Sequence, residues 1–116
     1  MVPITITRHK DTILDGSSNL LLYGYGSYGN SMSPGFSSTR LSLINRNIIW
    51  VTAHIRGGME RGMKWWKEGK LLNKKNTFED YIAVGNYLIE KKYTSKGKIL
   101  GMGGSAGGLL MGAVVN

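Results

Sequence analysis

Ser105 lies between Gly103 and Gly107 in the pattern Gly-x-Ser-x-Gly. This pattern is typical of a nucleophilic serine at the tip of a sharp turn from a strand into a helix. Small residues around the serine, here Gly103, Gly104 and Gly107, let the strand and the helix approach each other closely. The turn also aims the first helical N–H groups, here that of Ala106, at a developing oxyanion. The pattern predicts Ser105 as the nucleophile of an acyl transfer.

A flexible glycine-serine turn is the other interpretation of these residues, and the flanking segments decide between the two. The stretch 98–102 reads as a strand before the serine, and the apolar run 109–115 reads as a helix after it. A strand followed by a helix is the context that a nucleophile turn requires. The flanking segments therefore favour the catalytic interpretation.

A second glycine cluster follows the apolar run 20–23. Gly24, Gly26 and Gly29 match Gly-x-Gly-x-x-Gly, the fingerprint of a dinucleotide site. That fingerprint needs a helix to begin at its last glycine, and the segment around Pro34 does not favour one. No acidic residue follows about 20 positions later, where the ribose would be bound. We predict no dinucleotide site, no other cofactor and no metal site.

The elements that must position these residues follow from hydrophobic periodicity. Residues 4–9 alternate in polarity like a strand, and Asp15-Gly16 predicts the turn of an antiparallel hairpin into a strand at 20–23. Further along we predict a helix from Ser37 or Ser38 to about 45, with Leu41 and Ile44 on one face, and then a buried strand at 48–53. We predict a loop at 55–75 with one helical turn at 63–67. A helix at 77–92, which Thr77 and Asp80 open as a capping box, is followed by a buried strand at 98–102. Alternating strands and helices predict an α/β fold with a mainly parallel sheet.

Composition excludes several classes of protein. The chain has 116 residues, too few for more than one domain, and no cysteine, which excludes disulfide frameworks and thiol nucleophiles. Its net charge is +8, but the basic residues are scattered, so we expect no nucleic-acid partner. No apolar run approaches the roughly 18 residues of a membrane span. The N-terminus lacks the pattern of a secretory signal, which makes a cytoplasmic location the default expectation.

Four motifs together give the sequence a family resemblance. In chain order they are Gly24-Tyr25-Gly26-Ser27-Tyr28-Gly29, His54-Ile55-Arg56-Gly57-Gly58, Lys75-Asn76-Thr77-Phe78-Glu79-Asp80-Tyr81 and Gly101-Met102-Gly103-Gly104-Ser105-Ala106-Gly107-Gly108. This series resembles the peptidase domain of the prolyl oligopeptidase family, and the Gly-Ser-Ala-Gly-Gly form resembles its oligopeptidase B (protease II) branch. The resemblance runs over essentially the whole chain. Met59 departs from it, because a third glycine usually stands there.

The resemblance implies a cytosolic serine peptidase of α/β-hydrolase fold, capped by a β-propeller, that cuts short peptides, after Arg or Lys in the oligopeptidase B branch. It implies Ser105 as nucleophile, with the hydroxyl of Tyr25 and the backbone N–H of Ala106 as oxyanion donors. A phenol and an amide can share this task, and losing one such donor typically costs about 2.7–4 kcal/mol. Simple aromatic packing is the other interpretation of Tyr25.

The family order of the triad is Ser, then Asp, then His, and only 11 residues follow Ser105. Both histidines, His9 and His54, precede it, and we expect each to be structural or at the surface. Residues 1–116 are therefore predicted as a partial α/β-hydrolase domain, truncated after the helix that follows the nucleophile, without the propeller and the C-terminal part. A complementary chain would supply Asp and His.

Two other hypotheses remain beside this incomplete peptidase. In one, the chain is an inactive remnant whose motifs are inherited and idle. In the other, weaker one, it is a basic binding module that holds polyanions with salt-dependent affinity.

Overall fold

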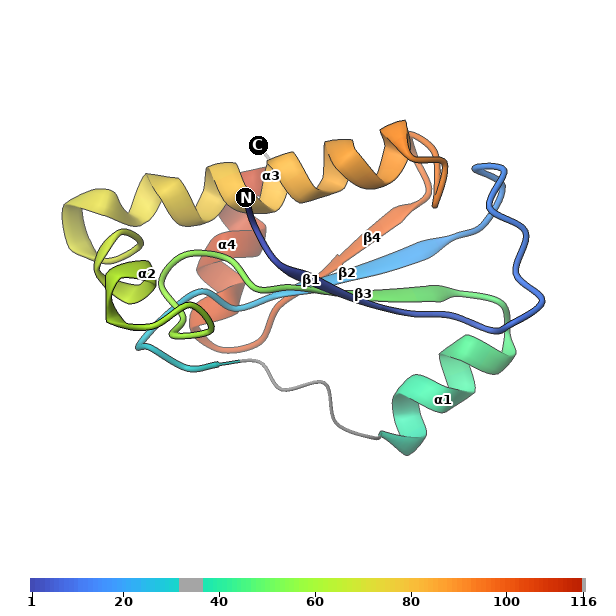
Figure 1. The fold of residues 1–116 in the computed structure, drawn as a ribbon, viewed down its shortest axis with the longest axis horizontal. Helices are drawn as coiled ribbons and strands as arrows, with labels where there is room; N and C mark the ends of the chain where they lie inside the picture. Colours follow the sequence, from blue (N-terminus) through green and yellow to red (C-terminus); the bar gives the residue numbers. More distant parts are fainter. Residues whose placement is uncertain (32–36, 116) are drawn as a thin grey trace.

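A four-stranded sheet forms the centre of the molecule in a computed structural model that describes residues 1–31 and 37–115 (Figure 1). The strands are β1 Ile4–Thr7, β2 Leu20–Gly24, β3 Ile49–Ala53 and β4 Ile99–Met102, and their order in the sheet is β1-β3-β2-β4. β2 is parallel to both of its neighbours, β3 and β4. The carboxyl ends of these three strands therefore lie at one edge of the sheet.

Helices lie on both sides of this sheet. The long helix α3, Lys74–Glu90, lies on one side and the short helix α1, Ser38–Asn45, on the other (Figure 1). Helix α4, Ala106–Val115, follows β4 and packs against α3. The core between the sheet, α3 and α4 contains Leu20, Leu22, Ile49, Val51, Ala53, Ile55, Tyr81, Val84, Leu88 and Leu110. Its apolar side chains fix α3 over the sheet, because burying each Leu, Ile or Val side chain stabilises the fold by roughly 1.5–3 kcal/mol.

The predicted N-terminal hairpin is wrong, although β1 is antiparallel as expected. β1 pairs with β3, with Ile4 opposite Ala53 and Thr7 opposite Trp50. The reason is that both edges of β2 are taken by its parallel partners. The turn at Gly16 instead meets the far end of α3, where its N–H donates to the Lys92 carbonyl at 2.9 Å.

The predicted capping box at the start of α3 is also wrong. The helix begins at Lys74, so Thr77 already lies within its first turn. The Thr77 hydroxyl donates to the Arg56 carbonyl at 2.6 Å, and the Asp80 carboxylate accepts hydrogen bonds from Arg56. Both side chains are therefore used to hold a neighbouring segment and not to cap the helix.

The remaining elements lie close to their predicted positions. Ser37 caps α1, its hydroxyl accepting the Arg40 N–H at 3.3 Å, although Ile44 is buried while Leu41 is 44% exposed. The predicted helical turn is α2, Met63–Lys67, and a short 3-10 helix, η1, follows at Leu71–Asn73.

β4 differs from its prediction as a buried strand. It is an edge strand with β2 on one side, and Leu100 and Met102 are 55% and 48% exposed. Within residues 1–31 and 37–115, no helix has the length and apolar character needed to cross a membrane.

Candidate active site

Ser105 lies at the tip of a sharp turn between β4 and α4. Its φ is +53°, a left-handed conformation that costs a non-glycine residue about 1–3 kcal/mol and is found most often at functional sites. The turn is closed by hydrogen bonds from Gly107 N–H to the Gly104 carbonyl and from Gly108 N–H to the Ser105 carbonyl, both 2.8 Å long. The Ser105 side chain is exposed. The structure thus forms the strand-to-helix turn that the sequence motif predicted.

The glycines around Ser105 divide into two kinds. A Cβ at Gly103 would lie 2.5 Å from the Gly107 carbonyl oxygen, and a Cβ at Gly107 would lie 3.0 Å from the Gly24 carbonyl oxygen. At Gly104 a Cβ would meet no atom within 4 Å. Gly103 and Gly107 are therefore needed because the turn packs directly against the end of β2.

Tyr25 follows β2 directly and lies beside this turn. A Cβ at Gly107 would approach the Tyr25 ring carbon Cδ2 at 3.5 Å, so the ring lies against the first turn of α4. Ala106 is the first residue of that helix, and both it and Tyr25 are half-buried. The structure therefore brings the predicted residues Ser105, Ala106 and Tyr25 to the same end of the sheet.

One histidine is structural and the other lies at the surface, as the sequence predicted. His54 is buried, and its ring is bound on both sides, to Thr5 Oγ1 at 2.8 Å and to Glu60 Oε2 at 3.1 Å. His9 lies on a surface loop, where its Nδ1 accepts the Asp11 N–H at 3.2 Å. Across the two described stretches of the chain, no three His, Asp or Glu side chains gather to hold a metal ion.

The segment that carries Tyr25 is bound to α3 through the side chain of Lys74. The Lys74 ammonium donates to the Gly26 carbonyl and, at 2.7 Å, to the Ser27 hydroxyl. Burial lowers the pKa of Lys74. A Cβ at Gly26 would lie 2.5 Å from Thr77 Cγ2, so this segment also touches Thr77 in the first turn of the helix.

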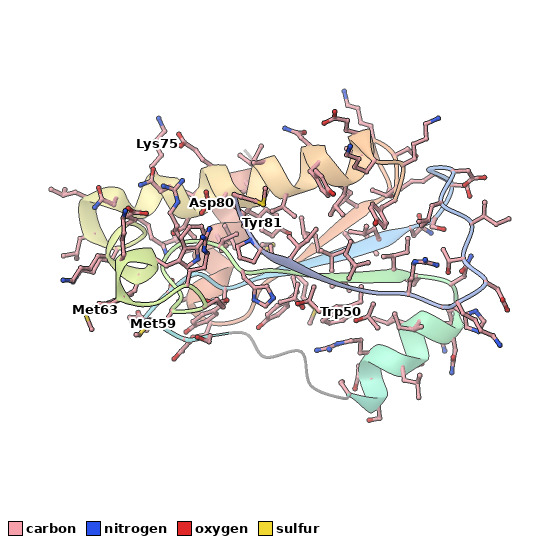
Figure 2. All side chains as sticks on the ribbon, in the orientation of Figure 1. Trp50, Met59, Met63, Lys75, Asp80 and Tyr81 are labelled. Carbon is pink, nitrogen blue, oxygen red and sulfur yellow. The ribbon has the colours of Figure 1, made fainter. Side chains whose placement is uncertain are left out.

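Arg56 and Asp80 bind the loop after β3 to the same helix. The Asp80 carboxylate accepts the Arg56 backbone N–H and Nε at 2.9 Å each, and Arg56 Nη2 at 2.8 Å. The hydrogen bond to Asp80 raises the pKa of Arg56. Figure 2 shows Asp80 and Tyr81 on the side of α3 that faces the sheet and Lys75 on the opposite side. This clamp holds the loop whose Gly57 carbonyl accepts the Gly29 N–H at 3.0 Å.

Sequence reasoning missed Lys74 and the Arg56–Asp80 pair as supports of the site. One signal was present, because Asp80 lies beside Tyr81 and one turn before Val84, both of which are buried. A carboxylate on the buried side of a helix needs a partner from another segment.

A cavity of about 430 Å³ opens beside the site. Its lining includes Ala106, Tyr28, Lys74, Trp66 and Leu109. A larger hollow of about 620 Å³ lies between the N-terminal residues and α3, and none of the candidate residues lines it. The smaller cavity is therefore the one that could receive a group bound next to Ser105.

Comparison with known proteins gives consistent matches along the whole chain. The sequence model of the prolyl oligopeptidase family matches residues 34–116. Dipeptidyl aminopeptidase BI of Pseudoxanthomonas mexicana and Protease 2 of Moraxella lacunata are 52% and 49% identical, each over 115 residues. These matches cover 99% of this chain but only 16% and 17% of the relatives. The structure of oligopeptidase B from Leishmania major matches with a TM-score of 0.93 and 46% identity, covering 97% of this chain and 16% of that protein.

Proposed function

Because this chain belongs to the prolyl oligopeptidase family, we propose that it supplies the nucleophile and the oxyanion donors of a serine peptidase that hydrolyses short peptides. The observation that carries the proposal is the left-handed turn at Ser105, which exposes the serine beside Ala106 and Tyr25. Matches over 99% of the chain to two curated peptidases give independent support.

The proposed reaction uses these three residues in one step. The Ser105 hydroxyl oxygen attacks the peptide carbonyl carbon while the general base takes the hydroxyl proton, and the carbonyl oxygen becomes the oxyanion of a tetrahedral intermediate. The Ala106 N–H and the Tyr25 hydroxyl donate hydrogen bonds to this oxyanion. Donors already fixed in place stabilise the transition state most, because they need no reorganisation as charge develops. When this intermediate collapses, the C–N bond breaks and the amine leaves with that proton, and water then hydrolyses the acyl-serine.

The general base and its orienting acid come from outside the described residues in this proposal. His54 is excluded because Thr5 and Glu60 occupy both of its ring nitrogens. A complementary part of the catalytic domain then supplies the Asp and His that the family order places after the serine.

Cleavage after Arg or Lys is the finer part of the proposal. It is supported by the Gly-Ser-Ala-Gly-Gly sequence around Ser105 and by the 46% identity to an oligopeptidase B. The acidic residues expected to hold a basic side chain do not belong to the cavity beside Ala106, whose lining includes Lys70 and Lys74.

The test uses Protease 2 of Moraxella lacunata with its matching segment replaced by residues 1–116, which we call the chimera. We expect it to hydrolyse short peptides ending in an arginyl amide, and Ser105→Ala to abolish this activity. Tyr25→Phe should lower kcat by about 10²–10³-fold with little change in KM, because it removes one oxyanion donor. A folded chimera without activity would instead support the inactive remnant, and unchanged kcat in Tyr25→Phe would refute the role of the phenol.

A further inference from the structure

We propose that Lys74 is a positioning residue that holds Tyr25 in place for the oxyanion. This inference rests on the proposed function, because it presumes that the Tyr25 hydroxyl donates to the oxyanion. Lys74 is the first residue of α3, and its ammonium reaches a loop almost fifty positions earlier in the chain. Its two acceptors, the Gly26 carbonyl and the Ser27 hydroxyl, belong to the two residues directly after Tyr25.

The loop after Tyr25 needs such support because its backbone is unusual. Gly26, Tyr28 and Gly29 have φ of +66°, +54° and +67°, all in the left-handed region. Glycine adopts this region freely, but Tyr28 does not, and a non-glycine residue keeps this conformation only where surrounding contacts hold it. The two acceptors of Lys74 lie at the start of this stretch, so the lysine fixes the point where the chain leaves Tyr25.

The surroundings of the Lys74 ammonium are those of a residue that holds a loop in place, and they differ from those of a lysine exposed to solvent. Its side chain lines the cavity beside Ala106, and burial lowers its pKa. Among the ion pairs of the described residues none includes Lys74, and its two hydrogen-bond acceptors are neutral. Burying an ammonium costs free energy, which its hydrogen bonds to the loop offset in part.

The neighbouring residue provides a matched control. Lys75 lies one position further along the same helix, is 83% exposed, and pairs with Glu79 at 3.6 Å on the helix surface. Replacing either lysine by methionine removes one positive charge from the start of α3. Only the change at Lys74 removes the two hydrogen bonds to the loop after Tyr25.

The experiment measures kcat and KM of the chimera for an arginyl peptide amide with Lys74→Met, alone and combined with Tyr25→Phe. A displacement of the phenol by a fraction of an ångström should lower kcat about tenfold and leave KM within about twofold. In the Tyr25→Phe background the same change should lower kcat by less than about twofold, because the group that Lys74 positions is already absent. Lys75→Met should leave both constants unchanged.

Ser27→Ala gives a second route that leaves α3 intact, in case Lys74→Met impairs folding. It removes one acceptor of the ammonium and should lower kcat about threefold, an effect that also disappears in Tyr25→Phe. Equal losses of kcat with and without the Tyr25 hydroxyl, or a change in KM with kcat unaffected, would overturn the positioning role. Failure of the proposed function itself looks different, because Tyr25→Phe would then leave kcat unchanged.

Discussion

At the residue scale, the two kinds of glycine around Ser105 make opposite predictions. Gly103→Ala should lower the free energy of unfolding by about 1–3 kcal/mol, because the new Cβ would lie 2.5 Å from the Gly107 carbonyl oxygen. Gly104→Ala should change it by less than about 0.5 kcal/mol, since its Cβ enters open space. Urea unfolding of the 116-residue chain, followed by tryptophan fluorescence, measures both. Equal effects of the two substitutions would show that Gly103 does not lie as close to the Gly107 carbonyl as described.

Tyr81 gives the fold a dependence on alkaline pH. Burial raises its pKa from 10.0 to about 12, and its hydroxyl donates to the Leu22 carbonyl at 2.6 Å. The folded state therefore keeps the proton longer than the unfolded state. The resulting stability is present in full below pH 10 and is lost as the pH rises from about 10 to about 12, by roughly 2–3 kcal/mol.

The measurement compares this alkaline loss in the wild-type chain, Tyr81→Phe and Tyr87→Phe. Tyr87 lies on the same helix and is 44% exposed, so its replacement is the matched control. We expect Tyr81→Phe to flatten the decline above pH 10 and Tyr87→Phe to leave it unchanged. The same steep decline in all three chains would contradict the burial of the Tyr81 hydroxyl.

At the scale of elements, the Arg56–Asp80 pair should account for much of the attachment between the loop after β3 and α3. Asp80→Asn should lower the free energy of unfolding by about 2–4 kcal/mol, because it leaves the Arg56 guanidinium without its counter-charge. The control is Glu79→Gln, one residue earlier, whose carboxylate is 55% exposed and pairs with Lys75 at the surface. It should cost less than about 0.5 kcal/mol. Urea unfolding distinguishes the two, and an Asp80→Asn effect as small as the control would refute the clamp.

The order and type of the elements could be predicted from the sequence, but not all of their pairings. Periodicity predicts the strands at 20–23 and 48–53 because each is a local apolar run. The partner of β1 could not be found in this way, since pairing with β3 depends on β2 being enclosed by parallel neighbours. Thr77 was misread as a cap for a similar reason, because its true acceptor belongs to Arg56.

The residues of the candidate site differ in the same way, because some belong to a local motif and others are joined by contacts between distant parts of the chain. Ser105 and its flanking glycines are contiguous, so their motif alone predicts the turn. Tyr25 was reached only through the resemblance of four motifs to a family. Lys74 was missed, because its hydrogen bonds join residues 47 and 48 positions apart and leave no local pattern.

At the scale of the whole molecule, the edge at β4 should make the isolated 116-residue chain self-associate. Leu100 and Met102 are exposed on this edge strand, and Leu109 of the following helix is 63% exposed. An unprotected apolar edge strand readily pairs with another chain. Light scattering with size-exclusion chromatography should show a mass that rises with concentration.

Leu100→Lys should reduce this association, because a charged side chain on an edge strand opposes pairing. Ile13→Lys is the control, since Ile13 is 70% exposed but lies outside every strand. A strictly monomeric chain at all concentrations, or equal effects of the two lysines, would show that the β4 edge is not the contact.

The most direct test of the account is covalent labelling of the chimera by a fluorophosphonate, with intact mass and peptide mapping as the readout. We expect one label per molecule, located on Ser105, lost in Ser105→Ala, and absent from the isolated 116-residue chain, in which both nitrogens of His54 are occupied. Labelling that persists in Ser105→Ala, or a folded chimera that takes no label, would contradict Ser105 as the nucleophile.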